Sequence, residues 1–196
     1  MHWLVTELSA IHRPALERHF LALDSKDRRL RFGIPLSDTA VRSYVSRIDF
    51  ERDAAFGVFG DELQLLGAAH VAHADQHAEL GVSVLLGYRN RGVGGTLLER
   101  ATLRARNWGV RALFMHCLRE NAAMVHVAHR RRMRIVIEAG EADAWLNLPP
   151  ADAASHFGEV FEQRVALFDY ALKSQFASAR RLAAAGWSFS HGTGGQ

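Results

Sequence analysis

The sequence has little cysteine, little proline and no long apolar run. Of its 196 residues, one is cysteine and four are proline. The single cysteine, Cys117, excludes an internal disulfide and agrees with a reducing cytoplasm. No apolar run approaches the roughly 18 residues of a membrane span, and Glu7 brings charge too early for a signal peptide. We therefore expect a cytoplasmic protein without a membrane segment.

Neither sign of charge dominates the chain. The 24 basic and 21 acidic residues leave a net charge of +3, and 48% of the residues are hydrophobic, enough for a sizeable core. This balance allows an anionic partner, but it argues against nucleic-acid binding on composition. The basic run Arg130-Arg131-Arg132-x-Arg134 falls at the end of an expected helix, where cations complement the helix dipole without any partner.

Apolar periodicity predicts the elements of a mixed α/β fold. We expect strands over residues 1–8, 54–59, 63–72, 79–86, 111–117, 133–138 and 142–148, and helices over 12–23, 39–48, 92–108, 121–131 and 152–185. The charged stretch 24–33 is not assigned to either. The order predicts an antiparallel front half of the sheet and a strand–helix–strand rear half.

A glycine-rich turn between an expected strand and an expected helix is the most informative segment. It reads Gly87-Tyr88-Arg89-Asn90-Arg91-Gly92-Val93-Gly94-Gly95-Thr96. Glycines let backbone N–H groups approach a ligand, and a helix N-terminus favours a pyrophosphate. A dinucleotide fingerprint would need glycine where Leu97 stands, and a P-loop would need a Gly-Lys pair. A structural corner without a ligand is the remaining alternative.

This turn resembles the signature of the GNAT (GCN5-related N-acetyltransferase) family. Arg89-x-x-Gly92-x-Gly94 matches the family's Arg/Gln-x-x-Gly-x-Gly/Ala pattern, and the resemblance extends from about residue 56 to 148. Within it, residues 78–84 look like the preceding strand, 97–101 like the following helix, and 121–124 like the Asn-x-x-Ala opening of the next helix. Upstream, residues 27–32 and 48–50 are similar to GNAT domains of bacterial protein-lysine acetyltransferases, although a solvated basic edge explains these arginines equally.

The resemblance and the pattern that follows it give a domain plan. The resemblance implies a GNAT acyltransferase domain over residues 1–150. Beyond the matched region, the break at Pro149-Pro150 and the apolar pattern after it predict a helical extension over 151–186, and the polar, glycine-rich end predicts a disordered tail over 187–196. The extension carries an apolar stripe at Val160, Phe161, Val165, Phe168, Leu172 and Phe176. Such a stripe either packs on the sheet or pairs with a second subunit, and we favour a homodimer.

The resemblance also implies a site for acetyl-CoA as acyl donor. The pantetheine arm would lie between splayed strands 82–86 and 111–117, with a backbone N–H near Val84 or Leu85 polarising the thioester carbonyl. The N–H groups of the glycine turn would hold the pyrophosphate. The donor-binding residues implied in this way are Val82, Val84, Arg89, Asn90, Arg91, Gly92, Val93, Gly94, Gly95, Thr96 and Asn121.

The implied reaction is direct transfer of an acetyl or short acyl group to a primary amine, either on a protein lysine or N-terminus or on a small molecule. Glu79 occupies the strand position of the family's catalytic glutamate and is the expected base, although an exposed strand-end carboxylate is the alternative. Many members place a tyrosine acid where this chain has Ala128. His126 and His129 lie nearby, but we favour solvent as the proton donor to the leaving thiolate. The loss of that tyrosine keeps open a second hypothesis, an acyl-CoA-binding sensor with little catalysis.

Two further features, a group of histidines and the single cysteine, could suggest a metal site or a nucleophile. His70, His73 and His77 have metal-like spacing, but no Cys, Asp or Glu completes a plausible set, so we expect no metal. Cys117 follows an apolar strand and could carry an acyl group, although a buried free thiol is the commoner outcome.

Overall fold

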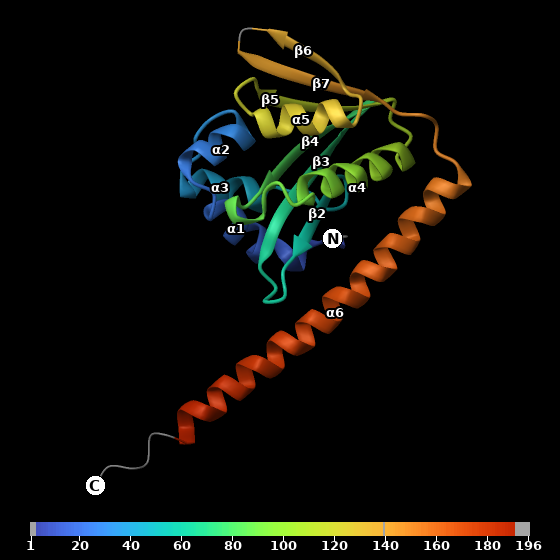
Figure 1. Cartoon of the computed structure of the whole chain (residues 1–196). Helices are drawn as coiled ribbons and strands as arrows, with labels where there is room; N and C mark the ends of the chain where they lie inside the picture. Colours follow the sequence, from blue (N-terminus) through green and yellow to red (C-terminus); the bar gives the residue numbers. More distant parts are fainter. Residues whose placement is uncertain (1–2, 139, 191–196) are drawn as a thin grey trace.

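The fold centres on one seven-stranded sheet with the strand order β1-β2-β3-β4-β5-β7-β6 (Figure 1). The computed structural model describes residues 3–138 and 140–190. Its strands are β1 (Thr6–Leu8), β2 (Ala54–Phe59), β3 (Leu65–Ala74), β4 (His77–Val84), β5 (Ala112–Leu118), β6 (Arg134–Glu138) and β7 (Glu141–Asn147). All neighbours pair antiparallel except β4 and β5, which are parallel and joined by a helix. The mixed α/β fold with these two halves confirms the sequence prediction.

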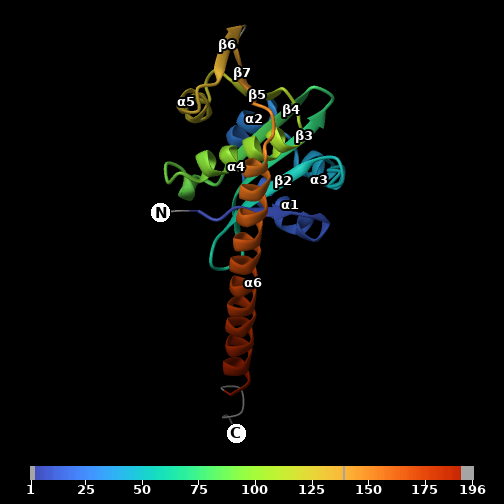
Figure 2. The ribbon, with the colours of Figure 1, turned by 90° about the vertical axis from the view of Figure 1, so that its right-hand side faces the viewer.

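Helices cover both faces of this sheet. One face is covered by α1 (Arg13–Leu21), α2 (Ser25–Phe32) and α3 (Asp38–Ser46) (Figure 2). The other face is covered by α4 (Val93–Asn107) and α5 (Ala122–Arg130). Short 3-10 turns, η1 (Ala10–His12) and η2 (Leu86–Tyr88), precede α1 and α4. Because side chains alternate along a strand, each face has its own core. Ala78, Leu80 and Val82 of β4 face α4, whereas Glu79, Gly81 and Ser83 face the helices at the N-terminal end.

The two central strands diverge along their length. β4 and β5 pair over only three residues, ending at Glu79 opposite Phe114. Beyond that point β4 continues to Val84 and β5 to Leu118 without further pairing between them. The sheet is therefore split on the carboxyl side of the parallel pair β4–β5, which is where open sheets bind ligands.

The helix α2 was missed by sequence analysis. None of its residues is buried, so it has no apolar stripe to give a periodic signal. Its ends are instead defined by caps: the Asp24 side chain accepts a hydrogen bond from the Asp27 N–H, and Gly33 closes the helix in the left-handed conformation. The other expected elements lie within a few residues of the predicted bounds.

The C-terminal helix α6 (Ala153–Ser190) runs along the domain and then extends beyond it (Figure 1). Glu159 fastens it to α4 by ion pairs with Arg100 (2.8 Å) and Arg104, and Lys173 donates to the Phe59 carbonyl (3.1 Å). The predicted apolar stripe does not pack on the sheet, because its large side chains are exposed. The helix ends a few residues later than expected, and residues 191–196 of the predicted tail lie outside the described residues. No helix in the described ranges is long and apolar enough to cross a membrane.

Candidate functional site

The glycine turn forms an open helix N-terminus beside the split in the sheet. Gly92 caps α4 with φ of +87°, a conformation that strains any residue with a Cβ. The first main-chain bond of the helix runs from the Thr96 N–H to the Gly92 carbonyl (3.0 Å), and no side chain caps the turn. The N–H groups of Val93, Gly94 and Gly95 are thus available to an anion.

Neighbouring side chains hold the turn in place. Arg89 donates from Nε to the Val84 carbonyl (3.0 Å) and pairs with Asp27 of α2 at 2.6 Å. Trp3 donates to the Arg91 carbonyl at 2.7 Å, while the exposed Arg91 guanidinium lies over the ring of Tyr88. Arg91 is therefore the arginine of the turn that stays open to solvent, whereas Arg89 supports the loop. Asn90 adopts φ of +58° between them.

A glycine on β3 allows α4 to lie close to the sheet. A Cβ on Gly67 would come within 2.6 Å of Val93 and 3.1 Å of Leu97. Gly67 pairs with Val84, the last residue of β4. Because α4 begins next to Gly67, it also begins next to the end of β4. The anion-binding turn and the split in the sheet consequently form one continuous feature.

The hydrogen-bonding direction of β4 identifies the backbone donors in the split. Leu85 donates its N–H to the Leu66 carbonyl of β3 (2.9 Å), so it is not available to a ligand. Because peptide groups of a strand alternate in direction, the N–H groups of Val82 and Val84 point toward β5. Of the two donors considered from sequence, Val84 rather than Leu85 faces the split.

A cleft of about 540 Å³ opens from the split onto the face of the sheet covered by α2 and α3. Glu79, exposed and aligned with the last β4–β5 pair, lies on its wall. The size falls in the usual range of small-molecule sites. The cleft is otherwise lined by Leu30 to Ile34, Leu36, Ala40, Ser43, Tyr44, Arg47, His70, Ala72, Leu80, Gly81 and His116 to Leu118.

A chain of three polar side chains enters this cleft from the front half of the sheet. The Tyr44 hydroxyl lies 2.8 Å from Nδ1 of His70, and His70 Nε2 lies 3.0 Å from Asp53. Burial and the nearby Arg31 charge lower the pKa of His70, against the opposing effect of Asp53. A neutral His70 fits both contacts, since Nδ1 then accepts from Tyr44 and Nε2 donates to Asp53. This arrangement was not predicted from sequence.

A second histidine lies across the split on β5. His116 lies two residues beyond Phe114, the register partner of Glu79, and therefore on the same sheet face as Glu79; it binds Asp143 of β7 through Nδ1 at 2.8 Å. Cys117 is buried and donates to the Ala142 carbonyl (3.1 Å); burial, followed by Asp143, raises the pKa of its thiol. The thiol is thus poorly suited to act as a nucleophile.

Comparison with known proteins identifies the family. The model of the acetyltransferase (GNAT) family matches residues 18–132, more than half of the chain. The chain belongs to the GNAT family. No curated protein matches the sequence significantly.

Solved structures share the GNAT fold at low identity. The GNAT domain of S. lividans PAT is 19% identical, with a TM-score of 0.64, over 74% of this chain and 89% of that one. YncA of Salmonella typhimurium, solved with its cofactor acetyl-CoA, is 12% identical (TM-score 0.59; 78% and 98% covered). The ribosomal-protein-S18-alanine N-acetyltransferase of Escherichia coli is 18% identical (TM-score 0.55; 76% and 94% covered).

This GNAT chain lacks a side-chain acid at the expected place on α5. Ala128 is fully buried against the sheet, whereas His126 and His129 are exposed and point elsewhere. Asn121 caps α5 by accepting from the Met124 N–H (3.2 Å), and its amide nitrogen lies 3.4 Å from the Leu30 carbonyl. Asn121 therefore ties α5 to α2, and its side chain is already engaged within the protein.

The three histidines with metal-like spacing lie apart. His70 is hydrogen-bonded to Tyr44, His73 packs edge-to-face against Trp108, and His77 packs at a tilt against Trp145. Among residues 3–138 and 140–190, no three His, Cys, Asp or Glu side chains gather as metal ligands.

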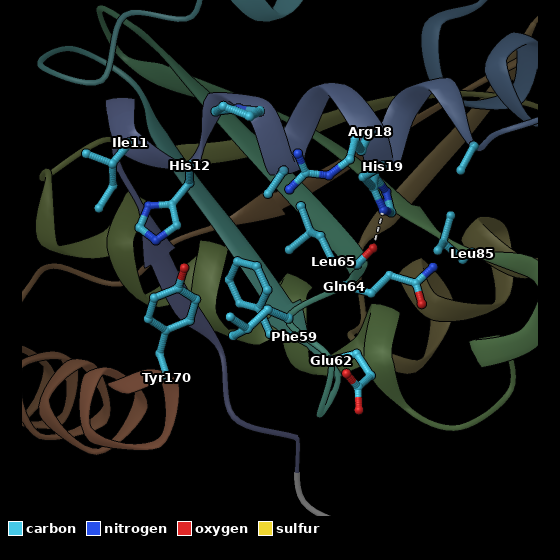
Figure 3. Close-up of a pocket in the computed structure, with 14 residues that line it drawn as sticks. Ile11, His12, Arg18, His19, Phe59, Glu62, Gln64, Leu65, Leu85 and Tyr170 are labelled. Carbon is cyan, nitrogen blue, oxygen red and sulfur yellow. Dashed lines mark hydrogen bonds between the residues drawn. The ribbon is translucent and has the colours of Figure 1, made fainter. Parts of the chain in front are cut away.

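A second cavity, of about 390 Å³, lies outside this site. It is bounded by α1, the β2–β3 hairpin and Tyr170 of α6 (Figure 3). His19, in its wall, is buried with Nδ1 on the Leu65 carbonyl and Nε2 on the Ser83 hydroxyl, both at 2.8 Å. Burial lowers the pKa of His19 to about 4, so this histidine is neutral and structural near pH 7.

Proposed function

We propose that the protein is an acetyl-CoA-dependent N-acetyltransferase that acts on a primary amine. The observation that carries this proposal is the continuity of three parts: the glycine turn, the split between β4 and β5, and the cleft that contains Glu79. A donor bound across the first two would present its thioester at the mouth of the third.

The residues present fit the donor. The N–H groups of Val93, Gly94 and Gly95 would hold the pyrophosphate, and Arg91 would add a positive charge at the rim. The backbone of Val82 and Val84 would bind the pantetheine arm. The Val84 N–H would stabilise the charge that develops on the carbonyl oxygen, an effect worth roughly 3–4 kcal/mol in acyl transfer.

The acceptor must lose a proton before it attacks. An alkylamine has a pKa of about 10.4 and is mostly ammonium at neutral pH. Glu79 would take that proton directly or through one water. The amine nitrogen then forms a bond to the carbonyl carbon as the carbon–sulfur bond breaks. The leaving thiolate takes its proton from solvent, since Ala128 offers none.

The structure suggests one competing base. His116, oriented by Asp143, shares the cleft with Glu79, and an imidazole is the commonest general base in enzymes. Glu79 retains the assignment because it stands on β4 at the start of the split. The pH profiles of Glu79→Gln and His116→Asn distinguish the two.

The test is release of CoA thiol from acetyl-CoA in the presence of amines. We expect turnover in the wild type and a loss of about 10²–10⁴-fold in Glu79→Gln, with acetyl-CoA affinity unchanged. Equal turnover in both proteins would refute the base assignment. Binding of acetyl-CoA without turnover on any amine would favour the sensor function instead.

A further inference from the structure

The cleft that contains Glu79, here called the acceptor cleft, also contains an arginine for which the described residues offer no counter-ion. Arg31, at the end of α2, is half-buried and forms one side-chain hydrogen bond, from Nη2 to the Tyr44 hydroxyl (3.0 Å). Its Nε is buried without a partner. In the described part of the chain, no carboxylate lies within ion-pair distance of its guanidinium. A charge withdrawn from water in this way normally has a partner.

The guanidinium is held over the backbone of β4. A Cβ on Gly81 would overlap it, so glycine is required there for Arg31 to reach the sheet. The rings of Phe20, Phe32 and Tyr44 surround it, with centroids 5.7, 4.8 and 5.7 Å from Cζ. Aromatic faces and Tyr44 thus orient the guanidinium without neutralising its charge.

The position of Gly81 sets the distance between Arg31 and the proposed base. Glu79 and Gly81 are two residues apart on one strand and share a sheet face. Two residues of a strand span about 7 Å. A short amino acid bridges such a span, with its ammonium at Glu79 and its carboxylate at Arg31.

We propose that the acceptor is a small amine that carries a carboxylate, which Arg31 binds. The inference rests on the proposed acetyl transfer and deepens it. A planar guanidinium recognises a carboxylate by paired, charge-assisted hydrogen bonds. A neutral amide offers one acceptor oxygen and no charge, and an ammonium offers no acceptor at all.

The experiment compares free amino acids with their carboxamides. Calorimetry measures binding of each α- and ω-amino acid and its amide to the protein loaded with CoA, and acetylation rates are measured with acetyl-CoA. We expect at least one acid to bind 10-fold or more tighter than its amide, and Arg31→Met to abolish that difference. Arg31→Lys should restore it only in part.

The outcomes separate this inference from the proposed function. If acids and amides bind and react alike while acetyl-CoA is still used, the role of Arg31 is wrong and the acetyltransferase stands. If acetyl-CoA itself fails to bind, the proposed function falls. Retained acid preference in a folded Arg31→Met would also overturn the assignment; circular dichroism checks the fold of that variant.

An independent observation concerns α6, which exposes its apolar side. The large side chains on this outward face have exposed fractions between 41% and 82%: Phe157, Val160, Phe161, Phe168, Leu172 and Phe176. The face that packs on the domain buries Ser155, Glu159, Ala166 and Ala177. A contiguous exposed apolar stripe of this length marks an interaction surface.

The spacing of the stripe favours a second α6 as its occupant. Phe161, Val165, Phe168 and Leu172 recur at intervals of four, three and four, the pattern of a coiled-coil seam. Arg164 and Asp169 flank this seam on opposite sides and are five residues apart. In two parallel helices those flanking positions face each other, so each copy would supply a positive charge to its partner's negative charge. Within one chain Asp169 pairs with Lys173 (2.7 Å).

We infer that two copies of this chain pair in parallel through α6. Sedimentation of the wild type should give a dimer, and Phe168→Glu a monomer that retains its helical signal and acetyl-CoA affinity. Arg164→Asp and Asp169→Arg should each weaken the dimer, and the double reversal should restore it. A monomeric wild type, or a dimer that persists in Phe168→Glu, would exclude the pairing. If the two single charge reversals weaken the dimer and the double reversal does not restore it, the parallel orientation is excluded.

Discussion

The Tyr44 hydroxyl lies 2.8 Å from Nδ1 of His70 and simultaneously accepts a hydrogen bond from Arg31 at 3.0 Å. This single hydroxyl links α3, β3 and α2 at the wall of the acceptor cleft. It sets the tautomer of His70 on one side and the orientation of Arg31 on the other.

Removing that hydroxyl should leave two partners incompletely satisfied. We expect Tyr44→Phe to lower the free energy of unfolding by about 1–3 kcal/mol, because the half-buried Nδ1 of His70 loses its donor. Urea denaturation of Tyr44→Phe, His70→Gln and the double variant gives the coupling between the two sites. A coupling energy near zero would contradict the hydrogen bond.

The buried His19 predicts a pH dependence of stability. Its folded pKa of about 4 lies below the ordinary 6.5, so the unfolded chain binds a proton that the folded chain does not. Stability should therefore fall as the pH drops from about 6.5 toward 4, by roughly 1.4 kcal/mol per pH unit from this group. The control is His19→Gln, whose stability should lack this dependence on pH. If the free energy of unfolding changed with pH in parallel for the two proteins, the prediction for His19 would be wrong.

The ion cluster that anchors α6 predicts a large effect of one carboxylate. Glu159 binds the fully buried Arg100 together with Arg104 and Asn107, and these contacts lower its pKa although burial alone would raise it. Glu159→Ala should cost about 3–5 kcal/mol, since it leaves Arg100 poorly compensated. The matched control, Glu162→Ala, removes a distant contact of 3.9 Å from an exposed side chain and should cost less than about 1 kcal/mol. If the two variants lost the same free energy of unfolding, the loss would come from a change in helix propensity and not from the ion cluster.

Two glycines of the phosphate turn should respond in opposite ways. Gly92→Ala places a Cβ in the left-handed region and should cost about 1–2 kcal/mol. Gly95→Ala falls inside α4 with open space around it and should stabilise the protein by about 0.5–1 kcal/mol. Thermal denaturation of both variants tests the assigned cap position; a neutral Gly92→Ala would place the cap elsewhere.

The parts of the site that were predictable are local in sequence. The glycine turn, the strand before it and the helix after it form one continuous segment, so the family resemblance could be carried in register onto Glu79, Val84 and Gly92. Alternation along β4 put Glu79 on the face opposite the α4 core. These positions needed no knowledge of how distant segments pack.

The acceptor cleft was not predictable in the same way. Arg31, Tyr44, His70 and His116 come from four separate elements, and their meeting depends on helix packing and sheet register. Arg31 lies on a helix that carries no apolar periodicity, and His70 was considered only for its metal-like spacing. The hint available in sequence was Gly81 within a strand, which often marks the close approach of another group.

If the glycine turn and the split form the acetyl-CoA site, isothermal titration should detect binding of acetyl-CoA that depends on Gly92. Acetyl-CoA should bind the wild type with micromolar affinity, weaken modestly in Gly92→Ala and be lost in Gly92→Glu, which adds a negative charge at the same strained position. NAD should give no heat of binding. An absence of acetyl-CoA binding to the wild type, or undiminished binding to Gly92→Glu, would contradict the account.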